Sequence, residues 1–280
     1  MRFATRWGRA LLALAALAAT AGAGAQDMAA QFAPPLDLKP VGFNEDVKDS
    51  IGFFTDVANT VFKPAGDGPF PAVVLMHTCG GLAGAPNAHM KRHAQELLEA
   101  GYVVLVVDSF RPRGFDDCRT RVLTGSAGIA DAYAALALLS AKPFVDGKRV
   151  FQAGYSWGAM IASYLASPQS ARMVDSPLRF AGTVANYGSC AYKKFKLVWP
   201  DTDRPHLLLL GGRDEEVPAT PCFPLLDEMK AAGQPVQWHV FPQASHAWDK
   251  QGLQHLGYVY DAQVTDEATA RMKAFFESVR

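Results

Sequence analysis

A short glycine-flanked segment places the strongest constraint on how this chain folds. Gly154–Gly158 reads Gly-Tyr-Ser-Trp-Gly, after a segment that can form a short buried strand (148–153) and before one that can form a helix (159–166). The pattern G-x-S-x-G between a strand and a helix is that of a nucleophile elbow, a tight turn that holds the serine hydroxyl clear of the backbone near the helix N-terminus. The turn is strained at the serine, so the residues two positions away must be small. The alternative is a glycine-rich turn with an ordinary N-cap serine.

Apolar strands alternate with helices along the rest of the chain. We expect the other strands at 72–76, 102–107, 180–185, 206–210 and 236–241, and the other helices at 87–100, 126–141, 221–232 and 266–279. Such alternation predicts an α/β fold with a mostly parallel sheet and helices on both faces. In these sheets the chemistry gathers just beyond the carboxyl ends of the strands.

The N-terminus has the layout of a secretory signal peptide. Arg2, Arg6 and Arg9 precede an apolar run (10–19), and small residues follow up to Ala25. The run is too short to span a bilayer comfortably, and we predict cleavage after Ala25 and a periplasmic or secreted protein without a stable membrane span. An uncleaved membrane anchor is the alternative.

The remaining sequence is long enough for one α/β domain with a substantial core. Residues 26–50 mix prolines with charges, and we expect an extended N-terminal segment on the surface. Residues 51–280 contain no Pro/Ser-rich linker or internal repeat, which predicts a single domain. The 27 basic residues balance the 27 acidic ones, so no nucleic-acid partner is indicated. The oligomeric state is left open.

A serine nucleophile needs a base, and four histidines follow Ser156. His206 begins an expected strand and His239 lies inside one, so neither is at a carboxyl end. His255 lies in a region without a clear pattern. His246 falls in the loop after the last apolar strand and is the candidate base, the alternative being an ordinary loop histidine.

The acid that orients the base should lie in the loop after the preceding strand. That loop begins with Gly211-Gly212-Arg213 and continues with Asp214, Glu215 and Glu216. Asp214 is the preferred candidate, because a residue one or two positions further along would usually point elsewhere. The two glutamates are weaker candidates and are explained equally well as solvated loop charges.

A third requirement is a pair of N–H donors for the tetrahedral oxyanion. The backbone N–H of Trp157, directly after the nucleophile, is one candidate. The loop after strand 72–76 supplies the other, because the paired glycines Gly80 and Gly81 let its backbone bend close to a substrate. We assign this second donor to Cys79, with Thr78 as the alternative.

With these pieces in order, the chain resembles the dienelactone hydrolase family within the α/β-hydrolase fold. The resemblance covers about residue 64 to the C-terminus and is carried by the segments 74–82, 101–110, 154–158, 211–218 and 245–248. It implies a hydrolase that acts on a small-molecule ester or lactone and requires no cofactor. The segment 187–205, where many members of the fold insert a cap, is short, so no large cap domain is expected.

The chain departs from the family pattern at two places. The best-known members use a cysteine nucleophile where this chain has Ser156, and they carry a glutamate where it has His77 and Thr78. Both departures favour a conventional serine esterase that forms an acyl-enzyme over true dienelactone hydrolysis. A serine peptidase or amidase, and a non-catalytic binding protein, remain the alternative functions.

Four cysteines in an exported protein are expected to form disulfides. In this fold the strands before Cys79 and Cys118 are neighbours, and so are those before Cys190 and Cys222. We therefore predict the pairs Cys79–Cys118 and Cys190–Cys222, the alternative being four free thiols.

Two arginines and a tryptophan are candidates for substrate contact. Arg111 and Arg113 lie in a strand-end loop, where they could bind a substrate carboxylate or serve a structural role; Arg119 and Arg121 carry less weight. Trp248, next to the candidate base, could wall an acyl pocket together with Trp157, or could pack in the core.

One histidine pair has a spacing compatible with metal binding. His89 and His93 are four residues apart on an expected helix, but Met90 stands where the metalloprotease pattern requires glutamate, and no third ligand is indicated. We interpret both as surface residues and predict no metal site.

Overall fold

The computed structural model describes residues 37–118, 123–192, 195–252 and 257–279. Several expectations lie outside these residues. They are the signal peptide at 1–25 with its cleavage site, the first part of the 26–50 segment, Arg119, Arg121 and His255.

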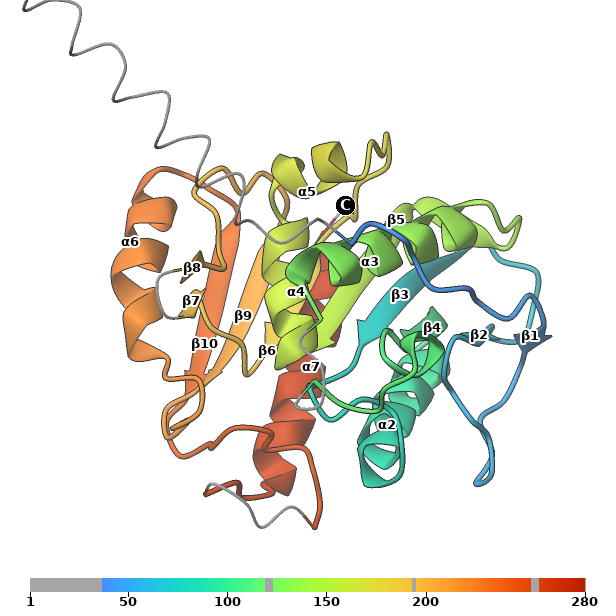
Figure 1. The fold of residues 1–280 in the computed structure, drawn as a ribbon, viewed down its shortest axis with the longest axis horizontal. Coiled ribbons are helices and arrows are strands. Elements are labelled where there is room, and N and C mark those ends of the chain that lie inside the picture. Colours follow the sequence, from blue (N-terminus) through green and yellow to red (C-terminus); the bar gives the residue numbers. More distant parts are fainter. Residues whose placement is uncertain (1–36, 119–122, 193–194, 253–256, 280) are drawn as a thin grey trace, which may run out of the picture. The chain divides into compact units, whose positions relative to one another are not determined.

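Eight strands form one twisted sheet in the order β1-β2-β4-β3-β5-β6-β9-β10 (Figure 1). Neighbouring strands are parallel except for β2 and β4. The strands span Val47–Lys48 (β1), Val61–Phe62 (β2), Phe70–Met76 (β3), Val103–Val107 (β4), Val145–Tyr155 (β5), Thr183–Asn186 (β6), His206–Gly211 (β9) and Val236–Phe241 (β10). A separate two-stranded antiparallel pair joins Ala191–Tyr192 (β7) to Phe195–Lys196 (β8).

Helices cover both faces of this sheet (Figure 1). They span Ala85–Glu99 (α2), Gly125–Ser140 (α3), Trp157–Leu165 (α4), Pro168–Met173 (α5), Phe223–Ala231 (α6) and Ala262–Ser278 (α7), with short 3-10 turns at Arg111–Arg113 (η1) and Thr220–Cys222 (η2). The predicted α/β-hydrolase architecture, a mostly parallel sheet between two helical layers, is confirmed. No large cap domain interrupts the described parts of segment 187–205.

Side-chain alternation along β3 shows which helices lie on which face. Val73 and Leu75 pack with α2 and α7, whereas Val74 and Met76 pack with α3 and α4. Successive strand residues point to opposite faces, so an unbroken apolar run is what a strand buried on both sides requires. Each fully buried valine or leucine contributes about 1.5–3 kcal/mol to stability. The packed core is therefore a rigid support for the loops that follow the strands.

The boundaries differ from the expected ones in a few places. The strand expected at 180–185 begins only at Thr183, and the helix α5 was not predicted at all. The Ser167 side chain caps α5 by accepting a hydrogen bond from the Gln169 backbone N–H, a local signal that the apolar pattern does not carry. The described part of the 26–50 segment is largely exposed, but Val41 is buried and its N–H donates to Asp131 Oδ1.

The four cysteines are joined as Cys79–Cys118 and Cys190–Cys222. The first disulfide ties the loop after β3 to the loop after β4, and these strands are adjacent in the sheet. The second ties the loop after β6 to η2, which follows the adjacent strand β9. Both therefore brace loops at the carboxyl edge of the sheet. Separately, none of the helices in the described ranges has the length and apolar character needed to cross a membrane.

Candidate active site

Ser156 sits at a strained turn between β5 and α4. Its backbone has φ 52° and ψ −105°, in the positive-φ region that L-residues rarely adopt. A Cβ on Gly154 would lie 1.9 Å from the Gly158 carbonyl oxygen, and a Cβ on Gly158 would lie 2.3 Å from that of Met76. Both glycines are therefore required for β3, β5 and α4 to approach this closely, and the turn has the geometry of a nucleophile elbow.

Three side chains from separate loops form a continuous hydrogen-bonded line at this turn. The Ser156 Oγ lies 2.9 Å from His246 Nε2, and His246 Nδ1 lies 2.7 Å from Asp214 Oδ2. The carboxylate can only accept, so Nδ1 carries the proton and the neutral ring offers its Nε2 lone pair to the serine hydroxyl. Asp214 and His246 are only 5 % and 4 % exposed, while Ser156 is partly exposed.

Of the three acidic residues in the loop after β9, one contacts His246 Nδ1. Asp214 is held by a second contact, because its Oδ1 accepts the Val217 backbone N–H at 2.7 Å. Glu215 is exposed, and the Glu216 carboxylate is 4.0 Å from His246 Nε2, on the serine side of the ring. Only Asp214 occupies the position that fixes the ring tautomer.

Aromatic side chains hold the His246 ring in place. The Tyr187 ring meets it edge-on with centroids 5.1 Å apart, and the Tyr258 ring lies 5.4 Å away. Trp248 is 1 % exposed and packs edge-on against Tyr187 and Phe241. The structure therefore places Trp248 in the core behind the histidine loop.

His77 organises the loop after β3. Its Nδ1 donates to the Thr78 carbonyl at 2.7 Å, and its Nε2 accepts the Ser109 backbone N–H at 3.2 Å. Complete burial lowers the pKa of His77, so the ring is neutral. The His77 carbonyl also accepts the Gly158 N–H at 3.0 Å, which ties the loop to the elbow, and the ring stacks on Trp157.

The two expected oxyanion donors lie on these connected segments. Trp157 is the first residue of α4, where a backbone N–H has no acceptor within the helix. Cys79 follows the His77 loop, and its carbonyl accepts the Cys118 N–H at 2.9 Å beside the disulfide. A Cβ on Gly81 would lie 2.0 Å from the Asp116 carbonyl oxygen, so the paired glycines let the two loops pack closely.

Both arginines of the β4 loop bind carboxylates of the protein itself. Arg113 forms a two-pronged pair with Asp131, with nitrogen–oxygen distances of 2.8 and 2.9 Å. Arg111 bonds to Asp108 and, at 3.1 Å, to Asp56. These contacts account for both side chains as braces of the loop and of the N-terminal segment.

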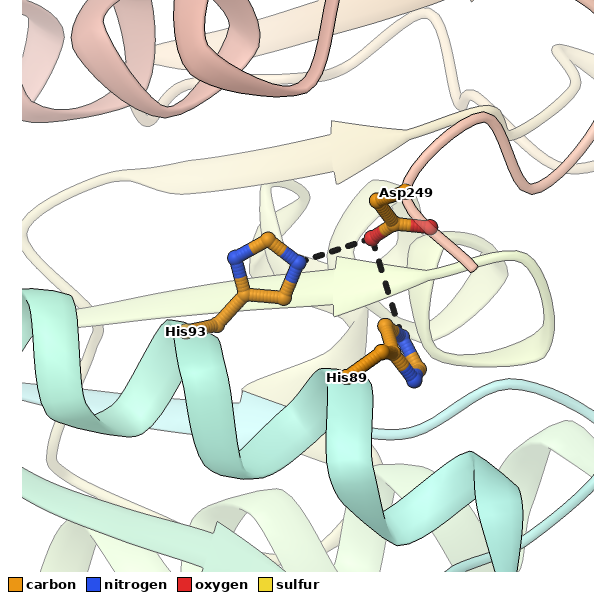
Figure 2. A group of neighbouring side chains, drawn as sticks. All are labelled: His89, His93 and Asp249. Atoms are coloured by element: carbon orange, nitrogen blue, oxygen red, sulfur yellow. Dashed lines mark hydrogen bonds and ion pairs between the residues drawn. The ribbon is translucent and has the colours of Figure 1, made fainter. Parts of the chain in front are cut away.

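The interpretation of His89 and His93 as surface residues is wrong. They are 6 % and 3 % exposed because α2 turns them inward, toward Asp249 from the loop after β10 (Figure 2). The third residue of the cluster, Asp249, follows the candidate base His246 by three positions. No sequence pattern connects it to His89 and His93, which lie more than 150 residues earlier. Only the folded chain brings them together.

The parallel sheet, its two helical layers and the site at the carboxyl strand ends define an α/β-hydrolase. The chain belongs to the dienelactone hydrolase family, whose family model matches residues 57–280. A Methylorubrum extorquens protein provisionally named carboxymethylenebutenolidase is 24 % identical over 226 residues, which cover 76 % of this chain and 74 % of that one.

Solved structures agree on the fold. The butyrate-bound esterase of Thermogutta terrifontis superposes with a TM-score of 0.61 at 15 % identity, covering 79 % of this chain and 88 % of that one. A dienelactone hydrolase-like promiscuous phosphotriesterase from metagenomic libraries gives a TM-score of 0.59 at 21 % identity, covering 76 % and 88 %. These likenesses bear on the fold alone, and it is the membership of the dienelactone hydrolase family that identifies the chain as a hydrolase acting on ester bonds.

Proposed function

We propose that this protein is an exported serine esterase that cleaves carboxylic esters or lactones through an acyl-enzyme. Ser156 is the nucleophile, His246 the base and Asp214 the acid. The observation that carries the proposal is the unbroken line from the serine hydroxyl through the imidazole to the carboxylate, with distances of 2.9 and 2.7 Å.

The geometry supports a two-step reaction. Ser156 Oγ attacks the ester carbonyl carbon while its proton passes to His246 Nε2, and the N–H groups of Trp157 and Cys79 stabilise the oxyanion. Collapse expels the alcohol, which takes the proton from Nε2. Water then gives a proton to the same nitrogen and attacks the acyl carbon. The acyl–Oγ bond breaks, Oγ takes the proton back from Nε2, and the acid leaves.

Neighbouring groups support a conventional serine triad over the cysteine chemistry of the best-known relatives. His77 stands where those relatives carry a glutamate, but both of its ring nitrogens are engaged by backbone groups. A neutral, fully occupied imidazole cannot exchange a proton with the nucleophile. Its role is to shape the oxyanion loop, which leaves His246 as the base.

Export is part of the proposal. Two disulfides at the site loops fit an oxidising compartment, as does the N-terminal pattern that predicts cleavage after Ala25. N-terminal sequencing of the protein recovered outside the cytoplasm is expected to begin at Gln26. A first residue of Met1 would contradict the cleavage.

Covalent labelling tests the catalytic assignment. A fluorophosphonate probe is expected to label Ser156 in the wild type and to leave Ser156→Ala unlabelled. Ser163→Ala is the matched control, because Ser163 lies two turns further along α4, is buried and bonds to Ala159 and His206. Labelling of Ser156→Ala at the wild-type rate would overturn the assignment.

A substrate panel separates the alternatives. Short p-nitrophenyl esters and small lactones are expected to be turned over, whereas the matching anilides are not. Preferential cleavage of anilides would indicate an amidase or peptidase. A folded wild type that is neither labelled nor active would indicate a binding protein.

A further inference from the structure

A second cluster of ionisable side chains lies apart from the serine–histidine–aspartate line. His89 and His93, one turn apart on α2, both turn toward Asp249 in the loop after β10 (Figure 2). The three residues are 6 %, 3 % and 4 % exposed. None of them takes part in the reaction proposed above.

The donor atoms of the cluster converge on one point. Asp249 Oδ2 lies 2.7 Å from His93 Nε2 and 3.7 Å from His89 Nε2. The other carboxylate oxygen, Oδ1, accepts the Tyr187 hydroxyl at 2.9 Å. Two imidazole nitrogens and one carboxylate oxygen are thus directed inward, with the carboxylate oriented from behind.

This spacing is close to that of a metal site. Ligands about 2.0–2.1 Å from a tetrahedral zinc ion lie about 3.3 Å from one another. The two nitrogen–oxygen distances in the cluster, 2.7 and 3.7 Å, lie on either side of this separation. A carboxylate shift of about 0.5 Å would equalise them and make room for the ion.

The surroundings of His93 are those of a metal-ligating histidine. Its Nδ1 and Glu96 Oε2 are buried, have no hydrogen-bond partner among the described residues and lie 3.9 Å apart. Histidines that bind a metal through one nitrogen usually donate the other N–H to a carboxylate. The Tyr155 ring stacks on His93 with centroids 4.6 Å apart and keeps the imidazole in this orientation.

Charge points the same way. A buried carboxylate is costly unless positive charge lies beside it, and a divalent cation held by two neutral imidazoles supplies that charge. Two imidazoles and a carboxylate are a donor set that suits zinc and its first-row neighbours.

We propose that His89 Nε2, His93 Nε2 and Asp249 Oδ2 bind a divalent transition-metal ion of the zinc class. Each imidazole then carries its proton on Nδ1. The fourth position is filled by a water molecule or by the Tyr187 phenol oxygen, which lies 3.5 Å from His89 Nε2.

The site is structural and braces the active-site loop. It links α2 to the loop after β10, in which Asp249 follows His246 by three residues. Tyr187 connects the two sites, because its hydroxyl binds Asp249 while its ring packs against His246. A bound metal therefore stabilises the fold and the position of His246 without contacting the substrate.

Metal uptake by the mature, disulfide-bonded protein is the direct test. After EDTA treatment, equilibration with ZnCl₂ and gel filtration, we expect one zinc per chain by mass spectrometry. Zinc at 100 times its Kd should raise the Tm by about 5 °C. Co²⁺ in place of zinc should give the intense visible bands of a four-coordinate site.

Variants identify the ligands. His93→Gln should lose stoichiometric zinc, and Glu96→Gln should bind it about 10-fold more weakly. His239→Gln, which alters a half-buried histidine on β10, is the control and should keep one equivalent. If His93→Gln does not fold, zinc binding by Glu96→Gln and the cobalt spectrum of the wild type show whether the cluster binds the metal.

A wild type that retains less than a tenth of an equivalent of zinc, shows no cobalt bands and has an unchanged Tm would overturn the proposal. The three side chains would then form a hydrogen-bonded network only. Loss of zinc from the His239→Gln control would overturn it too, because the ion would then lie elsewhere. Fluorophosphonate labelling of Ser156 is independent of these outcomes, so the esterase assignment succeeds or fails separately.

Discussion

Two buried histidine–aspartate pairs lie in the same part of this molecule and differ in the groups around them. His246 and Asp214 are 2.7 Å apart, and so are His93 and Asp249. In the first pair the aspartate binds Nδ1, so Nε2 is left facing a strained, partly exposed serine. In the second the aspartate binds Nε2, and a second histidine approaches the same oxygen.

The two pairs differ in the group that lies beyond the histidine–aspartate contact. A proton acceptor can act as a base only when a nucleophile stands at its free nitrogen, and the Ser156 hydroxyl has that position at His246 Nε2. Around Asp249 two imidazole nitrogens approach one buried carboxylate oxygen, an arrangement that favours cation binding and cross-linking of the fold.

The Asp214–His246 pair is expected to matter most for catalysis. Asp214→Asn replaces the acceptor at Nδ1 and favours the wrong ring tautomer, so kcat for a p-nitrophenyl ester should fall about 10⁴-fold. The matched change in the second pair, Asp249→Asn, should lower kcat less than about 10-fold. Steady-state kinetics on both variants would contradict the contrast if the two losses were equal.

The reverse order is expected for stability. Asp249→Asn removes the charge on which two histidines and Tyr187 converge, and the free energy of unfolding should fall by about 3 kcal/mol. Asp214→Asn keeps the Val217 contact and should cost about 1 kcal/mol. Urea unfolding at neutral pH measures both, and equal losses would count against a bracing role for Asp249.

Another buried histidine, His206, has hydroxyl groups in place of a carboxylate beside its ring. His206 is held by the hydroxyls of Thr183 and Ser163, at 2.8 and 3.3 Å, and burial lowers its pKa from 6.5 to about 4. Below about pH 6.5 His206 is protonated in the unfolded chain, whereas in the folded chain it stays neutral down to about pH 4. The free energy of unfolding is therefore unaffected above pH 6.5 and falls by about 3 kcal/mol between pH 6.5 and 4.

Comparison with His206→Gln isolates this effect. The wild type should lose more unfolding free energy between pH 7.5 and pH 4.5 than the variant does, measured by urea titration at each pH. A difference between the two proteins that is the same at both pH values would mean that His206 does not titrate in this way.

Glu216, an acid outside the first pair, is expected to affect catalysis least. Glu216 is exposed and 4.0 Å from His246 Nε2, so water screens its charge. Glu216→Gln should change kcat/KM for a neutral ester by less than about threefold. A loss near that of Asp214→Asn would move the role of the acid to Glu216.

Local signals explain how much of this protein could be predicted. Some segments predict their own environment. An unbroken apolar strand such as β3, β4 or β9 must be buried on both faces, and the elbow at Ser156 cannot tolerate a Cβ on its flanking glycines. From them followed the parallel sheet, the helical layers and the strand ends at which Ser156, Asp214 and His246 meet.

Features that depend on distant partners were left open by that reasoning. Arg111 and Arg113 suit either a substrate carboxylate or a structural role, and the folded chain places Asp56, Asp108 and Asp131 beside them. Trp248 could have lined a pocket, and its burial became visible only when Tyr187 and Phe241 closed around it. In each case the side chain suits either substrate contact or a structural role, and the residues packed around it determine which.

The elbow at Ser156 and the strands that lead to Asp214 and His246 could be recognised in the sequence, because each depends on residues that are neighbours along the chain. The inward direction of His89 and His93, toward Asp249, is visible only in the folded chain. A helix spacing shows which residues share a face, but what covers that face comes from a loop far along the chain. Burial and charge pairing depend on contacts between segments that are distant in the sequence, whereas turns and strands depend on neighbouring residues.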